Sequence, residues 1–352
     1  MKTASKQIVA IQVIRAFAAI CVVMGHSIEE YGNRFHCSVD AYMKYSWLNG
    51  VDLFFVISGF IMIVTNWDNF SKPKSPFAFI KNRIVRVVPA YYFFTLLVII
   101  IGIFVPATLG MTTIDVKQVI CSFLFFPCLR PKDHLFEPIL SVGWTLNYEM
   151  FFYALFTFAL LWKRKYGVPA LVFFLLLLAA LNPYIPISMP ALTFWTRPVI
   201  VEFAFGIIVG SLYRQGCIPQ LRSGVSLCLW LLTIVVFFMG KSVISVNAPR
   251  WISDGIPAAF VVFGALTIPD KTQKRIPSLF SAIGDASYST YLSHRFGLRI
   301  ATFVFVVLQG MLGLVNLWLF VALISIVSLG VGQLSYEYLE RPVLVYIRSG
   351  KK

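Results

Sequence analysis

The sequence predicts an all-α, polytopic membrane protein with about ten transmembrane helices and with both termini in the cytoplasm. The first observation is composition: 59% of the 352 residues are hydrophobic and 13% are charged. Soluble domains have about 45–50% apolar and about 25% charged residues. The second is that apolar residues recur in runs such as Ile8–Met24 and Val87–Val105, near the roughly 20 residues that cross a bilayer. The third is the distribution of the charges.

The apolar runs can be placed along the chain as about ten spans, in a single domain that covers residues 1–352. A further apolar run at 119–127 is too short to cross and ends at Pro127, so we expect a short interfacial or re-entrant element there. The expected spans are residues 8–27, 51–66, 87–105, 142–162, 168–182, 198–213, 223–240, 254–268, 282–308 and 314–334.

The net charge of +15 does not indicate nucleic-acid binding, because the basic residues follow the membrane topology. With the N-terminus inside, 19 of the 30 Lys and Arg residues fall on the cytoplasmic side, which is the positive-inside bias. Basic tracts such as Trp162–Tyr166 are therefore interpreted as topology anchors and contacts to lipid head groups.

The cysteines show no spacing typical of a metal site, and the sequence predicts no metal. Cys37, Cys121 and Cys128 are expected on or near the outer side. A disulfide among them is possible, but the sequence does not choose the pair.

The first span carries Arg15 and His26, which are eleven residues apart. That spacing is about 1100° of helix, so the two side chains lie within roughly 20° of one face and about 16 Å apart along the axis. An Arg at membrane depth needs a polar cavity or an anionic partner. As a structural alternative, Arg15 reaches the inner interface and His26 lies near water at the helix end. The shared face favours function for the pair.

Asp52 lies near the outer end of the second span, within the segment NGVDLFFVISGFIM. If the first two helices are antiparallel neighbours, Asp52 is roughly level with His26. A carboxylate beside an imidazole fixes its tautomer and raises its basicity, which suits a general base. A carboxylate stabilised by the helix dipole is an equal alternative.

Arg83 and Arg86 precede the third apolar run, in FIKNRIVRVVPAYY. Residues three apart share a helix face, and two guanidinium groups there suit phosphate oxygens, which Arg binds bidentately. Anchoring of the helix at the inner interface explains the same residues. The residues alone leave both interpretations open.

Two other spans carry polar residues at membrane depth. Glu149 lies about one and a half turns into the apolar helix of SVGWTLNYEMFFY, with Trp144 at the expected interface. A buried carboxylate needs a partner, which a substrate hydroxyl or a structural Arg would supply. The span at 282–308 carries Asp285, His294 and Arg295, and ionisable residues at this depth are functional candidates.

Taken in order, these segments resemble the acyltransferase 3 family of bacterial membrane O-acyltransferases, which modify surface glycans. The resemblance covers nearly the whole chain. It is carried by the Arg15–His26 element, GVDLFFVISGF, the Arg83–Arg86 pair with the following Pro-x-Tyr, WTLNYEMFFY, GDASYSTYLSH and YLERP. WTLNYEMFFY resembles most the members that acetylate exopolysaccharide. The chain departs from the family pattern at Ser293, where Trp is frequent, and at Met150 and Phe151, where Glu and Gln are frequent.

The resemblance implies an enzyme of the bacterial inner membrane that takes an acyl group from cytoplasmic acyl-CoA. Acetyl-CoA is the expected donor. The acceptor is a hydroxyl of a periplasmic or lipid-linked saccharide. Direct transfer and transfer through an acyl-histidine stay open. The implied roles are His26 as the catalytic residue, Arg15 in a polar track below it, Asp52 and Glu149 on the acceptor side, Arg83 and Arg86 on the phosphates of CoA, and Trp144, Asp285 and His294 in substrate binding.

Two other functions fit a polytopic chain with charges at membrane depth. A saccharide transporter or flippase suits discontinuous helices, and a non-catalytic partner of a glycan synthase is a third hypothesis. A transporter has no use for a CoA phosphate clamp, and a non-catalytic partner would cleave no thioester. The Arg15–His26 and Arg83–Arg86 pairs favour the enzyme.

Overall fold

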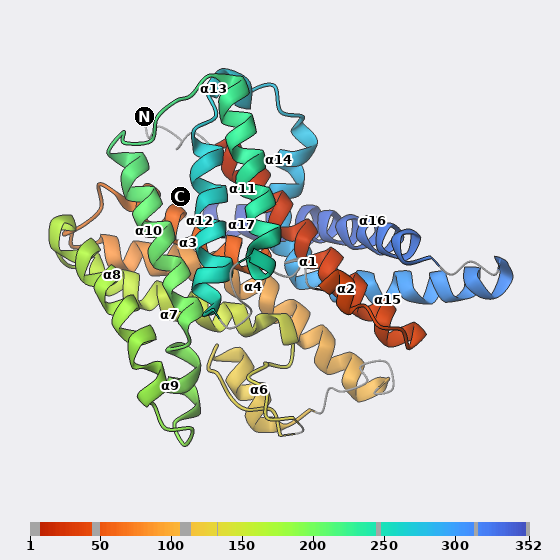
Figure 1. The fold of residues 1–352 in the computed structure, drawn as a ribbon. Helices are drawn as coiled ribbons and strands as arrows, with labels where there is room; N and C mark the ends of the chain where they lie inside the picture. Colours follow the sequence, from red (N-terminus) through yellow and green to blue (C-terminus); the bar gives the residue numbers. More distant parts are fainter. Residues whose placement is uncertain are drawn as a thin grey trace. The chain divides into compact units, whose positions relative to one another are not determined.

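The computed structural model describes residues 8–43, 50–105, 114–131, 133–243, 248–312 and 316–349, and the elements formed in these ranges are all helical (Figure 1). Residues 1–7 and 350–352 lie outside them, and the expected cytoplasmic termini with them. The chain divides into two compact units. Unit 1 comprises Met1–Thr65 and Phe205–Tyr338, and unit 2 comprises Asn66–Ala204 and Leu339–Lys352.

Unit 1 contains the first and the last long apolar helices. In chain order its helices are α1 (Val9–Phe35), α2 (Asp40–Met43), α3 (Gly50–Asn66), α10 (Val201–Arg214), α11 (Ser223–Val243), η5 (Trp251–Gly255), α12 (Ile256–Leu266), α13 (Asp270–Gln273), α14 (Ser278–Asp285), α15 (Ser287–Leu312), α16 (Leu317–Ser335) and η6 (Tyr336–Glu340). The ends of α3, α10 and η6 pass into unit 2.

Close packing of small residues holds α15 against α16, which lie side by side (Figure 1). A Cβ added to Gly297 would lie 2.7 Å from the Cα of Ser328, so only glycine permits this approach. Small residues at such contacts are typical of helix packing in membranes. Helix α1 packs on α12, α14, α15 and α16, and its C-terminal half meets α15, where His26 stacks on His294.

Unit 2 contains α4 (Ser75–Phe104), α6 (Val116–Phe123), η2 (Ser141–Gly143), α7 (Trp144–Ala159), α8 (Arg164–Leu181), η3 (Asn182–Tyr184), α9 (Pro190–Trp195), η4 (Pro198–Ile200) and α17 (Arg341–Ser349). Helix α7 packs against both α4 and α8. Aromatic rings fill the contacts: Phe152 stacks on Phe203 with centroids 4.3 Å apart, and Phe79 meets Phe156 at 4.9 Å.

Within the described ranges, six helices are long and apolar enough to cross a membrane. They are Val9–Phe35, Ser75–Phe104, Arg164–Tyr184, Ser223–Gly240, Ser287–Met311 and Leu317–Ile347. The chain is thus a multi-pass membrane protein. The count of about ten spans and the orientation stay predictions.

Several helix boundaries differ from the expected ones, and two of the differences have a clear structural cause. Helix α4 starts at Ser75 and runs through the basic segment and Pro89 as one helix, because a proline in a membrane helix is tolerated when its surroundings satisfy the freed backbone groups. The expected span at 282–308 is two helices, since α14 ends at Asp285 and α15 begins at Ser287.

The short run at 119–127 forms the end of α6 and the turn after it. The Asp115 side chain caps this helix by accepting a hydrogen bond from Gln118 N at 3.0 Å. The structure pairs Cys121 with Cys128 in a disulfide and leaves Cys37 as a free thiol. Of the three cysteines that the sequence left open, these two are the partners.

Candidate functional site

His26 lies in the C-terminal half of α1, one turn before Glu29, and the two side chains form a hydrogen-bonded pair. His26 Nδ1 is 2.8 Å from Glu29 Oε2, and the side chains are 17% and 37% exposed. An ionised carboxylate only accepts hydrogen bonds, so Nδ1 donates. The proton on Nδ1 leaves a lone pair on Nε2. Glu29 therefore sets the tautomer that a general base or a nucleophile requires.

A second histidine lies against the first. The rings of His26 and His294 are stacked, with centroids 5.2 Å apart and an interplanar angle of 16°. His294 Nδ1 is 2.8 Å from the carbonyl oxygen of Tyr291. A carbonyl only accepts, so His294 also carries its proton on Nδ1. Its Nε2 is buried, and no other described residue contacts this atom as a hydrogen-bond partner.

Charged residues on α1 and α15 surround this histidine pair. Arg295, the residue after His294, interacts electrostatically with His26, Glu29 and His294. Further out, Arg299 donates to Glu30 at 3.1 Å. A guanidinium group near the imidazoles stabilises negative charge that develops beside them.

Arg15 is on the same helix as His26, as the sequence predicts. Its side chain is 9% exposed, and its Nη1 donates to Gln12 Oε1 at 3.0 Å. Arg15 is therefore held inside unit 1 by a neutral amide one turn earlier. This contact is compatible with a polar track along α1.

Asp52 does not take the place beside His26 that the sequence suggested. Its buried carboxylate accepts two hydrogen bonds from Arg250, both 2.9 Å long. The reason is that the start of α3 packs against α1 at Ala18. A Cβ on Gly50 would lie 2.2 Å from the carbonyl oxygen of Ala18. Ala18 precedes His26 by about 12 Å of helix axis. The carboxylate on the His26 imidazole is that of Glu29.

In unit 2, Arg83 and Glu149 belong to one cluster, whereas the sequence placed them at opposite sides of the membrane. The Tyr153 hydroxyl donates to Glu149 Oε1, and the Arg83 guanidinium lies 6.0 Å from the centroid of the Tyr153 ring. Arg83 interacts electrostatically with Tyr153, Arg86 and Glu149. Helices α4 and α7 meet here, so these carboxylate and guanidinium groups stabilise each other across the contact.

The structure brings His294 to His26 within unit 1. Of the other two residues assigned to substrate binding, Trp144 belongs to unit 2 and Asp285 to unit 1. Trp144 is the first residue of α7 and packs edge-on against Tyr148, with centroids 6.0 Å apart. Asp285 is the last residue of α14, at the break before α15. Neither residue is among the partners of His26.

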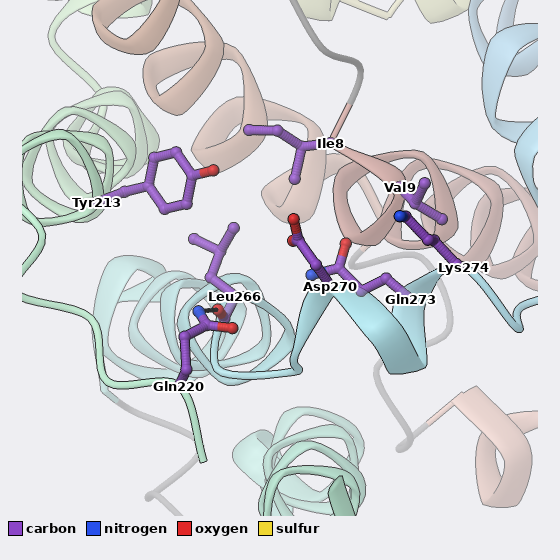
Figure 2. Close-up of a pocket in the computed structure, with 8 residues that line it drawn as sticks. All are labelled: Ile8, Val9, Tyr213, Gln220, Leu266, Asp270, Gln273 and Lys274. Carbon is purple, nitrogen blue, oxygen red and sulfur yellow. Dashed lines mark hydrogen bonds between the residues drawn. The ribbon is translucent and has the colours of Figure 1, made fainter. Parts of the chain in front are cut away.

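A small cavity lies at the start of α1, far along the helix from His26 (Figure 2). Its volume is about 120 Å³, which is below the roughly 300 Å³ of small ligand pockets. Gln273 in its wall accepts a hydrogen bond from Ala10 N at 3.1 Å and so caps the first turn of α1, whose own N-cap residue provides no side-chain bond. This capping explains Gln273 in the lining, and Gln220 in the same wall donates to the carbonyl oxygen of Leu266 at 3.1 Å.

Sequence reasoning missed Glu29 and Arg250. Glu29 could have been found, because residues three apart on a helix are neighbours and GHSIEE places it in that position. Arg250 follows Asp52 by 198 residues, and no local pattern marks the pair.

Comparison with known proteins agrees with the motifs. Residues 8–337 match the model of the acyltransferase 3 family, described as an acyltransferase domain. The chain is 33% identical over 303 residues to the exopolysaccharide production protein ExoZ of Rhizobium meliloti (strain 1021), over 84% of this chain and 89% of that protein. No solved structure matches. Since the family match extends over most of the chain, this chain belongs to the acyltransferase 3 family.

Proposed function

We propose that this protein is an O-acetyltransferase of the bacterial inner membrane. It moves an acetyl group from cytoplasmic acetyl-CoA to a hydroxyl of a periplasmic or lipid-linked saccharide. Membership of an acyltransferase family and likeness to an exopolysaccharide production protein support the reaction and the class of acceptor. The His26–Glu29 hydrogen bond is the observation that carries the proposal.

The His26 imidazole is suited to acyl transfer because each of its nitrogens has a defined task. Nδ1 is held by Glu29, which orients the ring and stabilises positive charge on it. Nε2 keeps its lone pair and takes a proton from the acceptor hydroxyl or attacks the thioester. Arg295 would stabilise the oxyanion of the tetrahedral intermediate.

The other predicted residues have supporting roles in this proposal. Arg83 and Arg86 bind phosphate oxygens of the donor, for which guanidinium groups are well suited. The alternative is a structural role, in which Arg83 neutralises the Glu149 carboxylate and binds no phosphate. Arg15 continues the polar face of α1 below His26. Asp52 acts through Arg250, whose side chain is 40% exposed and so available to a saccharide.

Mass spectrometry of surface glycans tests the proposal. A deletion strain complemented with the wild-type gene should carry acetylated glycan, and the strain complemented with His26→Gln should not. Glutamine keeps hydrogen-bonding capacity but takes no proton, so we expect a loss of about 10²–10⁴-fold. His36→Gln, at the exposed end of α1, is the matched control.

Folding of each variant is checked by its level in membranes and by its melting temperature in detergent. Normal acetylation by folded His26→Gln would exclude His26 as base or acyl carrier. A transporter or a non-catalytic partner predicts a different result, namely that the purified protein never releases CoA from acetyl-CoA.

A further inference from the structure

His294 has one nitrogen that the fold uses and one that it does not. Nδ1 donates to the Tyr291 carbonyl oxygen, one turn earlier on α15. The Ser328 hydroxyl donates to the backbone carbonyl of His294 at 3.4 Å, so α16 also holds this turn. Nε2 is buried without a hydrogen-bond partner among the described residues, and the whole residue is 0% exposed.

Structural needs alone do not explain an imidazole here. A buried acceptor without a donor costs free energy, and a phenyl ring would fill the same space without that cost. The buried hydroxyls without partners, such as those of Ser287 and Ser293, differ because a hydroxyl hydrogen can rotate toward a backbone carbonyl. The His294 ring is fixed by its Nδ1 bond, so Nε2 cannot turn toward another donor. The hydroxyl of a bound acceptor would supply the missing donor.

The partner of His294 in the site indicates what that hydroxyl does there. The His26 ring is stacked on His294 at 5.2 Å, and its Nδ1 is occupied by Glu29. His26 therefore has a single nitrogen, Nε2, for chemistry. If this nitrogen carries the acyl group, it has no lone pair left to take the proton of the acceptor hydroxyl. A two-step transfer then needs a second base. Nε2 of His294, in the adjacent ring, carries a lone pair that no described residue uses.

We propose that acyl transfer proceeds in two steps, with His26 as the acyl carrier and His294 as the general base of the second step. This inference rests on the proposed function. In the first step His26 Nε2 bonds to the acyl carbon, the carbon–sulfur bond breaks, and CoA leaves as the thiolate while the Nδ1 proton passes to Glu29. In the second step the saccharide oxygen bonds to the acyl carbon and its proton goes to His294 Nε2.

The same step restores His26. Its bond to the acyl carbon breaks, and Nδ1 regains the proton from Glu29. The proton on His294 then passes through solvent to the CoA thiolate, so that the products are the saccharide ester and CoA thiol. Of the two histidines, the first step needs only His26, whereas the second needs both, and this difference can be measured.

The test is isotope exchange between labelled CoA and acetyl-CoA, in nanodiscs without acceptor, set beside glycan acetylation in cells. Wild type should catalyse exchange, and His26→Gln should lose both exchange and acetylation. His294→Asn places its amide nitrogen near the position of Nδ1 and so can keep the bond to Tyr291. We expect it to retain exchange and to lose acetylation by about 10²–10⁴-fold.

His294→Phe keeps a stacked ring and provides a second variant if the first does not fold. It should also retain exchange, and the exposed-site variant His36→Gln should change neither readout. Absence of exchange in an active wild type would overturn the proposal, as would normal acetylation by a folded His294 variant. Proportional loss of exchange and acetylation would mean that His294 only supports the His26 ring, which also overturns it. Failure of the proposed function is distinct, since wild type would then acetylate no glycan.

Discussion

At the scale of single residues, Glu29 controls the state of His26 through one contact. The carboxylate lies one turn after the imidazole on α1 and receives its Nδ1 proton at 2.8 Å. The carboxylate stabilises the positive charge that begins to develop on the ring when Nε2 takes a proton or attacks an acyl carbon. Removal of the negative charge should therefore slow the reaction without moving the ring.

Glu29→Gln tests this contact. The amide oxygen can still accept from Nδ1, so the ring orientation should persist while the charge is lost. A hydrogen bond to a charged group is worth about 1.5–3 kcal/mol, so the rate should fall by about 10–150-fold. Initial rates of CoA release from acetyl-CoA measure it. Glu30→Gln is the control, because Glu30 pairs with Arg299, and an equal loss in both variants would contradict the assignment.

The Asp52–Arg250 pair is a second residue-scale case, and here stability is the readout. Asp52 is 0% exposed and Arg250 is 40% exposed, so water can replace part of the guanidinium. Arg250→Ala should lower the free energy of unfolding by about 1–3 kcal/mol, seen as a lower melting temperature. Arg299→Ala, at a side chain that is 55% exposed, should cost about 1 kcal/mol or less.

A double variant separates structure from catalysis at this pair. Arg250→Ala alone leaves the buried Asp52 carboxylate without its cation. Asp52→Asn combined with Arg250→Ala removes that negative charge as well, so the double variant should be more stable than Arg250→Ala alone. If Arg250→Ala keeps full stability but loses transfer, the pair serves the acceptor side directly.

At the scale of helices, the contact of α4 with α7 decides what Arg83 and Arg86 do. Arg83→Ala together with Arg86→Ala should weaken acyl-CoA binding at least about tenfold, since two charge-assisted contacts are lost. Equilibrium binding of CoA and of dephospho-CoA measures the loss and shows which phosphate is held. Lys81→Ala removes an exposed charge on α4 and is the control.

The opposite result has a structural meaning. Arg83 interacts with Glu149, so a purely structural role predicts normal CoA binding and a lower melting temperature in the double variant. Addition of Glu149→Gln should then restore part of the stability, because the carboxylate no longer needs a cation.

The helices also show which features the sequence alone predicts. Apolar runs locate the long helices, and the spacing of Arg15 and His26 assigns both correctly to one helix, because these signals are local. The position of α3 along α1 depends on the contact of Gly50 with Ala18. This contact joins two separate apolar runs, so neither run alone predicts it. The prediction of Asp52 beside His26 failed for this reason.

The sequence also failed to predict the break between α14 and α15. The segment is apolar enough to be taken as one span, yet the helix ends at Asp285. Gly284 just before it packs on the Gln12 backbone, where a Cβ would lie 2.2 Å from the carbonyl oxygen. The approach of α1 therefore fixes this region, and through it the position of His294, so the histidine pair could not be read from either helix alone.

At the scale of the whole molecule, the charge bias predicts the side of each loop. Reporter fusions after Lys165 and after Arg275 should be cytoplasmic, and a fusion within 182–190 should be periplasmic, because short basic loops stay inside. Alkaline phosphatase and green fluorescent protein fusions report the two sides. Opposite results at two of the three positions would rule out the arrangement with about ten spans.

The disulfide that joins α6 to the segment after it gives the chain a chemical marker of membrane sidedness. In the proposed bacterial inner membrane, the cytoplasm keeps thiols reduced and the periplasm favours their oxidation, so the bond between Cys121 and Cys128 predicts that this segment faces the periplasm. Cys217, an exposed free thiol just after α10, belongs to the opposite, reducing side in the predicted topology. An impermeant maleimide added to intact cells should therefore reach Cys121 and Cys128 only after a reductant, and Cys217 only after the membrane is opened.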